Sequence, residues 1–347
     1  MRWDLFCRVI DNHGDLGVSW RLACGLAAAG DSVSLWVDDA RALSWMAPRG
    51  AQGVEVRAWT ATTPFHTADV ADVVVETFGC ELPTAFVQSM VRRQPAPVWV
   101  NLEYLSAEGY VDRSHGLPSP RPSGLTTWFF FPGFSERSGG LLREPGLMQQ
   151  QAGFDGRDWL ARHGWAPRAG ERVMSLFCYT QPGLEAWLPL LATAPTLLLA
   201  TPGPATEQLR ALKMPGALRV IELPWLSQPD YDRLLWACDL NAVRGEDSLV
   251  RALWAPAPLL WQLYPQHDGV HARKLEAFLD RLLQDAAPPL AAPVRQTQRH
   301  WNGLAPLPAS LPDLAAWGQV QQLLRARLLM QDDLVTQLRR FVHSKSG

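Results

Sequence analysis

The segment "WDLFCRVIDNHGDLGVSWRLACGLAAAG", residues 3–30, decides the fold, because an apolar run leads through a glycine-containing turn into a helical pattern. Turns of this kind often bind phosphate, but Asp11 and Asp15 would place carboxylates where a phosphate needs N–H groups. The glycines also miss the G-x-G-x-x-G spacing of dinucleotide-binding proteins. The two aspartates therefore favour a cationic partner, or a proton to be removed, over a phosphate.

The rest of the first half repeats this alternation of strand and helix. Apolar runs typical of buried parallel strands occur at residues 3–11, 32–38, 54–60, 71–79 and 97–106. From about residue 112 the pattern breaks into a stretch rich in Pro, Gly and Ser, followed by the aromatic run "TTWFFFPGF" and a glycine-rich loop. We expect long irregular loops there.

The second half resumes the alternation, with apolar runs at residues 172–179, 196–203, 218–226, 239–245 and 258–265. We therefore predict an α/β protein of two Rossmann-like, doubly wound domains that face each other across a cleft. The expected domains are residues 1–160 and 161–325. A helix in residues 326–347 is expected to pack back on the first domain.

Composition excludes several classes of protein. The chain has 347 residues, of which 47% are hydrophobic and 19% charged, enough for a substantial core. A net charge of −2 gives no basic field for nucleic acid. The five cysteines are scattered and contain no C-x-x-C, which indicates buried thiols in a reducing compartment. Without an N-terminal signal pattern or a long apolar span, we expect a cytosolic protein with no membrane partner.

Three groups of residues could carry chemistry. The first is the pair Asp11 and Asp15 at the carboxyl end of the first strand, where open α/β sheets bind their ligands. The alternative is structural: Asp11 caps a turn and Asp15 caps the following helix.

The second group is "RGEDS", residues 244–248, between an apolar strand and an amphipathic helix. The N–H groups near Glu246, Asp247 and Ser248 could hold a diphosphate, although acids at a helix start are also ordinary partners of the helix dipole. Arg244 favours the binding interpretation, because a guanidinium suits a bidentate phosphate contact.

The third group follows the strand at residues 218–226. Trp225 and Tyr231 flank Gln228 and could stack on a base and hydrogen-bond to it, although aromatics on amphipathic helices more often lie in cores. His267 and His271 are four residues apart but have no third ligand, so solvated histidines are the simpler interpretation and no metal is expected.

Several long strings together resemble the elongation factor P arginine rhamnosyltransferases, the EarP family. They are "WDLFCRVIDNHGDLGVSWRLACGLA", "VWVNLEYLSAE", "HGLPSP", "FFFPGF", "GGLLRE", "SLFCY" and "RGEDSLVRALWAPAPLLWQLYPQ". The resemblance runs from Trp3 to about Phe278 and weakens beyond. It implies a GT-B glycosyltransferase that moves rhamnose, with inversion, from dTDP-β-L-rhamnose to one arginine of elongation factor P.

The resemblance also implies site residues. The catalytic set is Asp11, Asp15 and Glu246. The contacts to the nucleotide sugar are Phe177, Tyr179, Trp225, Gln228, Tyr231, Arg244, Asp247 and Ser248. His13 stands where we expect a tyrosine in the family, and Trp225 and Tyr231 stand where phenylalanines are usual, which preserves aromatic stacking.

The chemistry of arginine agrees with this assignment. The pKa of a guanidinium is above roughly 12, so the group stays protonated at neutral pH. Its nitrogen therefore has no free lone pair for attack on an anomeric carbon. Asp15 is assigned as the general base, Asp11 as the partner that orients the cation, and Glu246 as a further acidic contact. Arg244 and a helix N-terminus would stabilise the departing diphosphate without a metal. The alternatives are a GT-B enzyme with another nucleotide sugar or acceptor, and a non-catalytic clamp for a basic protein loop.

Overall fold

The computed structural model describes residues 1–10, 13–264 and 269–346, and the chain divides into two compact units. Unit 1 comprises Met1–Pro145 and Met330–Gly347, and unit 2 comprises Gly146–Leu329. Asp11 and His267 lie outside the described residues. None of the described helices is both long enough and apolar enough to span a bilayer.

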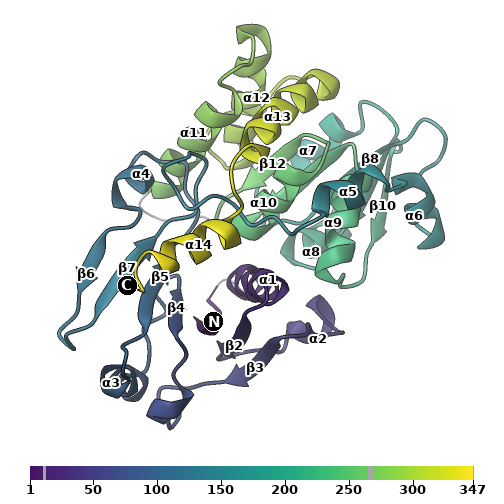
Figure 1. Ribbon diagram of the computed structural model, residues 1–347. Helices are drawn as coiled ribbons and strands as arrows, with labels where there is room; N and C mark the ends of the chain where they lie inside the picture. The colour runs from purple at the N-terminus through teal and green to yellow at the C-terminus, as the bar shows by residue number, and fades with distance from the viewer. Residues whose placement is uncertain (11–12, 265–268, 347) are drawn as a thin grey trace. The chain divides into compact units, whose positions relative to one another are not determined.

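Unit 1 is built on one twisted sheet (Figure 1). Its strands, in spatial order, are β3 (Val54–Ala58), β2 (Ser32–Val37), β1 (Arg2–Cys7), β4 (Val73–Thr77), β5 (Val98–Leu102), β7 (Thr126–Phe130) and β6 (Pro118–Pro120). All neighbouring strands are parallel except β6, which is antiparallel to β7. Short helices α2 (Leu43–Met46) and α4 (Tyr110–Ser114) lie in its connections.

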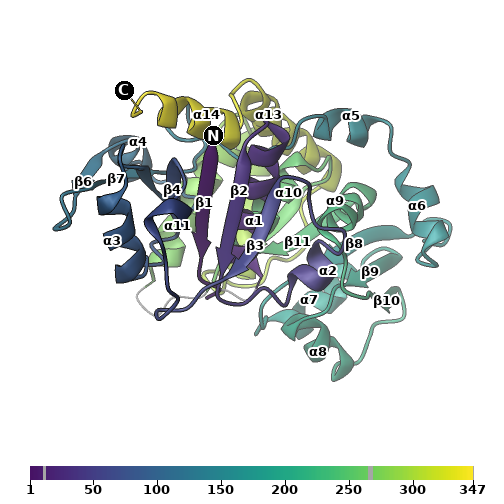
Figure 2. The same ribbon diagram turned by 60° about the horizontal axis from the view of Figure 1, so that its bottom comes forward.

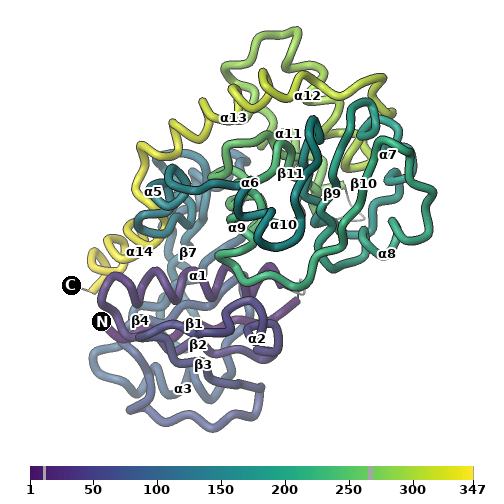
Figure 3. The backbone as a smooth tube through the Cα atoms, turned by 90° about the vertical axis from the view of Figure 1, so that its right-hand side faces the viewer, coloured from purple at the N-terminus to yellow at the C-terminus, as the bar shows by residue number. Residues whose placement is uncertain are grey.

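The central strands β1, β4 and β5 are buried on both faces, as their continuous apolar sequences predict. Alternate residues of β1 enter two different cores: Leu5 packs with α1 (Gly14–Ala28) and α14 (Leu334–His343), whereas Phe6 packs against α3 (Thr84–Arg92). Figure 3 shows α1 and α3 on opposite sides of the strands. The C-terminal helix α14 thus completes the core of unit 1.

Close approach of α14 to α1 depends on a glycine. A Cβ atom at Gly25 would lie 2.6 Å from Cγ2 of Val335, which is closer than carbon atoms can approach without displacement. The absence of a side chain at residue 25 therefore lets α14 lie directly on α1, beside β1 and β2 (Figure 2).

Unit 2 contains a five-stranded, fully parallel sheet. The strands, in spatial order, are β10 (Leu218–Glu222), β9 (Thr196–Ala200), β8 (Arg172–Leu176), β11 (Leu240–Arg244) and β12 (Leu259–Gln262). The helices are α5 (Leu147–Ala152), α6 (Gly156–Arg162), α7 (Leu184–Leu191), α8 (Pro204–Arg210), α9 (Gln228–Ala237), α10 (Gly245–Trp254), α11 (Val270–Leu282), α12 (Pro288–Trp301) and α13 (Leu314–Leu329).

Every apolar run interpreted as a strand overlaps a strand of the structure, but two expectations need correction. The run "TTWFFFPGF" contributes β7, which pairs in parallel with β5, rather than irregular structure. Helices α5 and α6, which precede or straddle the boundary expected near residue 160, belong to unit 2. Their place follows from packing, because Trp159 and Leu160 of α6 share a buried cluster with Leu234 of α9.

Candidate functional site

Asp15 is a buried carboxylate in unit 1, at the second position of α1 and 3% exposed. His13, not Asp15, is the N-cap residue, and no side-chain cap is formed there. The Asp15 carboxylate instead accepts the backbone N–H of Ile10 at 2.9 Å. Asp15 therefore lies at the carboxyl end of β1 without serving as the helix cap, which was the alternative interpretation of its sequence.

An aromatic pair borders this carboxylate. The Tyr104 hydroxyl donates to Asp15 Oδ1 at 3.4 Å, and its ring stacks on Phe78 with centroids 4.3 Å apart. Phe78 follows β4 and has a φ of 58°, a left-handed conformation that costs free energy for a residue with a side chain. The carboxyl ends of β1, β4 and β5 thus bring together a carboxylate, a hydroxyl and two rings.

A buried cation forms the centre of the predicted nucleotide-sugar site in unit 2. Arg244 ends β11 and is 7% exposed. Its guanidinium carbon lies 4.5 Å from the ring centroid of Phe177 and 4.6 Å from that of Tyr179, the two aromatics that follow β8. Its Nη1 atom is buried and has no hydrogen-bond partner among the described residues. Buried N–H groups normally donate to an acceptor, so Nη1 of Arg244 is able to donate a hydrogen bond to a ligand.

Tyr231 of α9 completes the aromatic lining. Its ring packs edge-on against Phe177 with centroids 5.6 Å apart. Burial raises the pKa of Tyr231, and the neighbouring Ser248 hydroxyl opposes that shift only in part. The Tyr231 hydroxyl is buried beside Ser248 and remains a neutral group able to bind a ligand.

Gln228 and Trp225 stand at the start of α9. Gln228 is the first residue of the helix and 8% exposed, three positions before Tyr231 and hence on the same helix face. Trp225 precedes the helix and is 44% exposed. The structure therefore gathers Phe177, Tyr179, Tyr231 and Arg244, whereas Trp225 lies on the loop that precedes the helix.

The N-terminus of α10 begins directly after Arg244. Gly245 has a φ of 65°, a left-handed turn that joins β11 to the helix without an intervening loop. Asp247 is partly buried and Ser248 is 5% exposed, so both lie in the first turn beside the arginine. The positive end of the helix dipole adds to the charge of Arg244 at this point.

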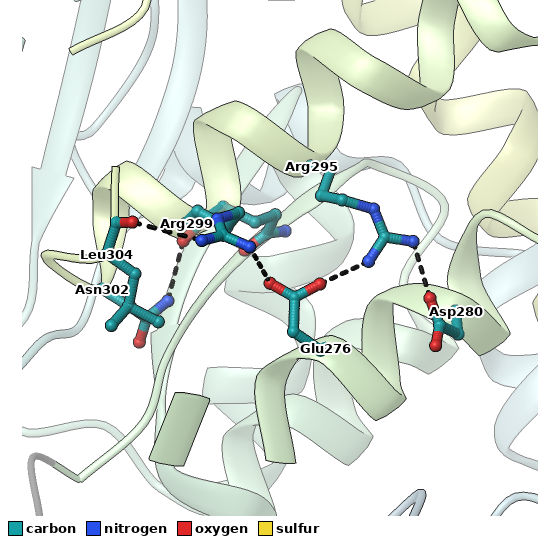
Figure 4. Close-up of polar contacts among 7 residues, drawn as sticks. Glu276, Asp280, Arg295, Arg299, Asn302 and Leu304 are labelled. Carbon is teal, nitrogen blue, oxygen red and sulfur yellow. Dashed lines mark hydrogen bonds and ion pairs between the residues drawn. The ribbon is translucent and has the colours of Figure 1, made fainter. Parts of the chain in front are cut away.

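Glu246 forms an ion pair with Lys274 of α11. Side chains around Glu276 hold α11 against α12, as Figure 4 shows. Glu276 accepts hydrogen bonds from both Arg295 and Arg299, the latter at 2.6 Å, and Arg295 also binds Asp280 at 2.7 Å. This network fixes the helix that carries Lys274.

The described residues contain no group of three or more His, Cys, Asp or Glu side chains that could hold a metal. His271 is the second residue of α11, four positions after His267, which lies outside the described residues.

All five cysteines are free thiols, and Cys24 alone among them is not fully buried.

Sequence reasoning missed three residues of these surroundings. They are Tyr104, which binds Asp15, Lys274, which pairs with Glu246, and Gln262, which pairs in register with Arg244 across β11 and β12. Each had a weak signal. Tyr104 and Gln262 are polar groups at the ends of apolar strand patterns, and Lys274 is one of only three lysines in the chain. Tertiary structure was needed to place them, because Lys274 is 28 residues from Glu246 in sequence.

The fold is that of GT-B glycosyltransferases. The structure resembles the glycosyltransferase VinC, with a TM-score of 0.55 and 14% identity over 100% of both chains. It also resembles MurG of Acinetobacter baumannii, with a TM-score of 0.52 and 12% identity over 99% of both chains. At these identities the likeness shows the fold alone.

Relatives of higher identity establish the family. The family model described as elongation factor P (EF-P) rhamnosyltransferase EarP matches residues 3–343. A protein-arginine rhamnosyltransferase of Pseudomonas aeruginosa is 44% identical over 98% of both chains, and one of Neisseria meningitidis serogroup B is 37% identical over 92% of this chain and 88% of its own. A solved structure concerning EarP-mediated arginine glycosylation of translation elongation factor EF-P has a TM-score of 0.65 and 32% identity over 99% of both chains. The chain belongs to the EarP family and is a protein-arginine rhamnosyltransferase.

Proposed function

We propose that this enzyme transfers rhamnose from dTDP-β-L-rhamnose to an arginine side chain of elongation factor P, with inversion at the anomeric carbon. The acceptor is supported by the family description and by the EarP structure that concerns EF-P. The nucleotide is supported by the chemistry of unit 2, where aromatic faces and an amide adjoin a buried cation.

The observation that carries the proposal is the state of Arg244. Its guanidinium is desolvated between two rings, its Nη1 atom lacks a partner among the described residues, and it directly precedes the N-terminus of α10. A diphosphate would satisfy the arginine and interact favourably with the helix dipole. As the bond between the anomeric carbon and the β-phosphate oxygen breaks, the same groups would stabilise the charge on the departing dTDP.

On the acceptor side we propose that Asp15 takes the proton that arginine loses as its new C–N bond to the anomeric carbon forms. The buried carboxylate is held by an N–H group and a hydroxyl, which fix its position. Asp11 is proposed to orient the guanidinium, and Glu246 to contact the sugar or the acceptor.

The nucleotide contacts are proposed to divide by element. Phe177 and Tyr179 come from the segment after β8, and Trp225 comes from the loop before α9. Gln228 and Tyr231 come from the first turns of α9, and Asp247 and Ser248 come from the first turn of α10. We propose further that transfer needs no metal, since Arg244 and the α10 N-terminus supply the positive charge that a metal supplies in other enzymes. A translation factor as acceptor also supports a cytoplasmic location.

Intact-mass spectrometry tests the proposal. Elongation factor P incubated with the enzyme and dTDP-rhamnose should gain one deoxyhexose mass, and fragmentation should locate it on arginine. The same incubation with dTDP-glucose or UDP-glucose is the control. Transfer from a control sugar at an equal rate would refute the proposed sugar, and modification of another residue type would refute the proposed acceptor. Tight binding of elongation factor P without transfer would support the clamp instead.

A further inference from the structure

Gln262 is a buried glutamine with an unsatisfied acceptor next to Arg244. It ends β12, is 4% exposed, and pairs in register with Arg244 across the parallel strands β11 and β12. Residues paired in this way direct their side chains to the same face of a sheet. The amide of Gln262 therefore shares a face with the guanidinium of Arg244.

One half of the amide is fixed by the protein. Nε2 donates to the carbonyl oxygen of Thr180 at 3.1 Å, immediately after Tyr179. The reverse orientation would set an amide oxygen against a carbonyl oxygen, so this hydrogen bond determines which atom is which. Oε1 is buried and has no partner among the described residues. A buried acceptor left without a donor destabilises the protein, and a ligand that donates to it recovers that free energy.

The backbone at Gln262 is held rigidly although β12 is an edge strand. The side chain of Asn302 donates to the carbonyl of Trp261 at 2.8 Å and accepts the N–H of Leu263 at 3.0 Å. Gln298 of α12 likewise accepts the N–H of Trp261 at 3.1 Å. These amides pair with the open edge of the strand on both sides of Gln262, so its side chain is presented by a fixed backbone.

Charge and strand order select the ligand group. Oε1 requires a hydrogen-bond donor, which a diphosphate lacks, and an acceptor guanidinium would bring a second cation toward Arg244. Along the carboxyl edge of the sheet, the aromatics after β8 come first, then Arg244 of β11, then Gln262 of β12. A nucleotide lying on the aromatics with its diphosphate at Arg244 therefore carries its sugar toward Gln262.

We propose that Gln262 is a recognition residue for the sugar, accepting a hydrogen bond at Oε1 from a hydroxyl of the hexose on the nucleotide diphosphate. This inference rests on the proposed function. It assigns sugar selectivity to β12. The aspartates, the aromatics and the "RGEDS" segment all lie outside this strand. A site built to accept a hydroxyl rejects a sugar that lacks it, because the buried acceptor is then left unpaired.

Calorimetry with two ligands tests the inference. Gln262→Leu should raise the dissociation constant of dTDP-rhamnose about 10-fold, because the sugar hydroxyl then has no acceptor, and leave that of dTDP within about 2-fold of the wild-type value. An unchanged affinity for dTDP-rhamnose would overturn the inference. Equal weakening of both ligands would do so too, since it would place the amide on the nucleotide.

Gln321 provides a matched control within unit 2. It is also buried, with Nε2 donating to the carbonyls of Ala252 and Ala257 and Oε1 unpartnered among the described residues. These carbonyls are at the end of α10 opposite Arg244. Gln321→Leu should therefore cost stability in a thermal melt while both dissociation constants stay unchanged.

A second measurement keeps the wild-type chain, in case Gln262→Leu does not fold. Among dTDP-hexose analogues that each lack one hydroxyl, one should bind about 10-fold more weakly to the wild type. If no single deoxygenation weakens binding, the inference is wrong. Failure of the wild type to bind dTDP or dTDP-rhamnose would refute the proposed function itself, which separates the two results.

Discussion

Arg251 of α10 binds Asp232 of α9 through two hydrogen bonds of 2.8 Å, and both side chains are buried. The pair joins the helix that carries Gln228 and Tyr231 to the helix that begins after Arg244. A bidentate pair fixes orientation as well as distance. It therefore fixes the position of the aromatic side of the proposed nucleotide site relative to its cationic side.

Asp232→Asn should lower the free energy of unfolding by about 3–5 kcal/mol, because it leaves the guanidinium of Arg251 buried without its counter-charge. Urea denaturation of the wild type and the variant measures the loss. The exposed pair of Arg233 and Asp230 on the same helix is the control, and Arg233→Ala should cost no more than about 1 kcal/mol. Similar losses in the two variants would show that burial does not govern the strength of the pair.

The strands could be predicted from sequence because parallel strands buried on both faces leave long apolar runs. β7 escaped prediction because Pro and Gly segments on both sides of it resemble loop sequence, and only its pairing with β5 gives it a place in the sheet. The family resemblance of the sequence also implied that Phe177, Tyr231 and Arg244 belong to one site, and their side chains are in contact in the structure.

Other features depend on information that a single sequence does not contain. The partner of Glu246 is on another helix, and the unsatisfied oxygen of Gln262 is defined by strand register and by the carbonyl of Thr180. The N-cap position of α1 belongs to His13 although Asp15 has the better capping side chain. Contacts between distant segments decide each of these cases, so local sequence propensity could not predict them.

Glu76 of β4 should make stability depend on pH. Burial raises its pKa to about 7, and Arg121, 3.3 Å away, only partly opposes that shift. Since the unfolded chain releases this proton at lower pH, the folded state binds more protons between the two values, and the free energy of unfolding falls as pH rises toward 7. Glu76→Gln removes this dependence, so its stability relative to the wild type should rise by up to about 3 kcal/mol from pH 4 to pH 8.

Urea denaturation at both pH values provides the test for Glu76. The exposed Glu185→Gln variant is the control, and its stability relative to the wild type should change little over the same range. A constant difference between the wild type and Glu76→Gln at the two pH values would show that folding does not raise the pKa of Glu76.

Arg244→Lys should raise the dissociation constant of dTDP by about 10-fold or more. Lysine keeps the charge but loses the planar fork that lies over two rings and can bind two phosphate oxygens at once. Calorimetry measures the change, and Arg210→Lys, at an exposed pair on α8, is the matched control. Equal dTDP affinity in wild type and Arg244→Lys would remove the arginine from the site.

Metal removal tests the proposed stabilisation of the leaving group. Transfer should continue at an unchanged rate after exhaustive chelation, and a variant with both His267→Ala and His271→Ala should remain active. The rhamnosylation rate before and after dialysis against a chelator provides the measurement. Loss of turnover that one divalent ion restores would contradict the assignment of this role to Arg244 and the α10 N-terminus.

Asp15→Asn should separate catalysis from structure. Asparagine retains an oxygen that can accept the N–H of Ile10 and an amide that can face the Tyr104 hydroxyl, so the melting temperature should change little. The amide cannot take a proton from arginine, and turnover should fall by a factor on the order of 10² to 10⁴. Tyr104→Phe is the companion variant, since it removes a hydrogen bond to the carboxylate but leaves the base, and its loss should be much smaller. Rhamnosylation rates at several concentrations of elongation factor P, beside thermal melts, distinguish these outcomes. A folded Asp15→Asn enzyme with wild-type turnover would show that another group removes the proton.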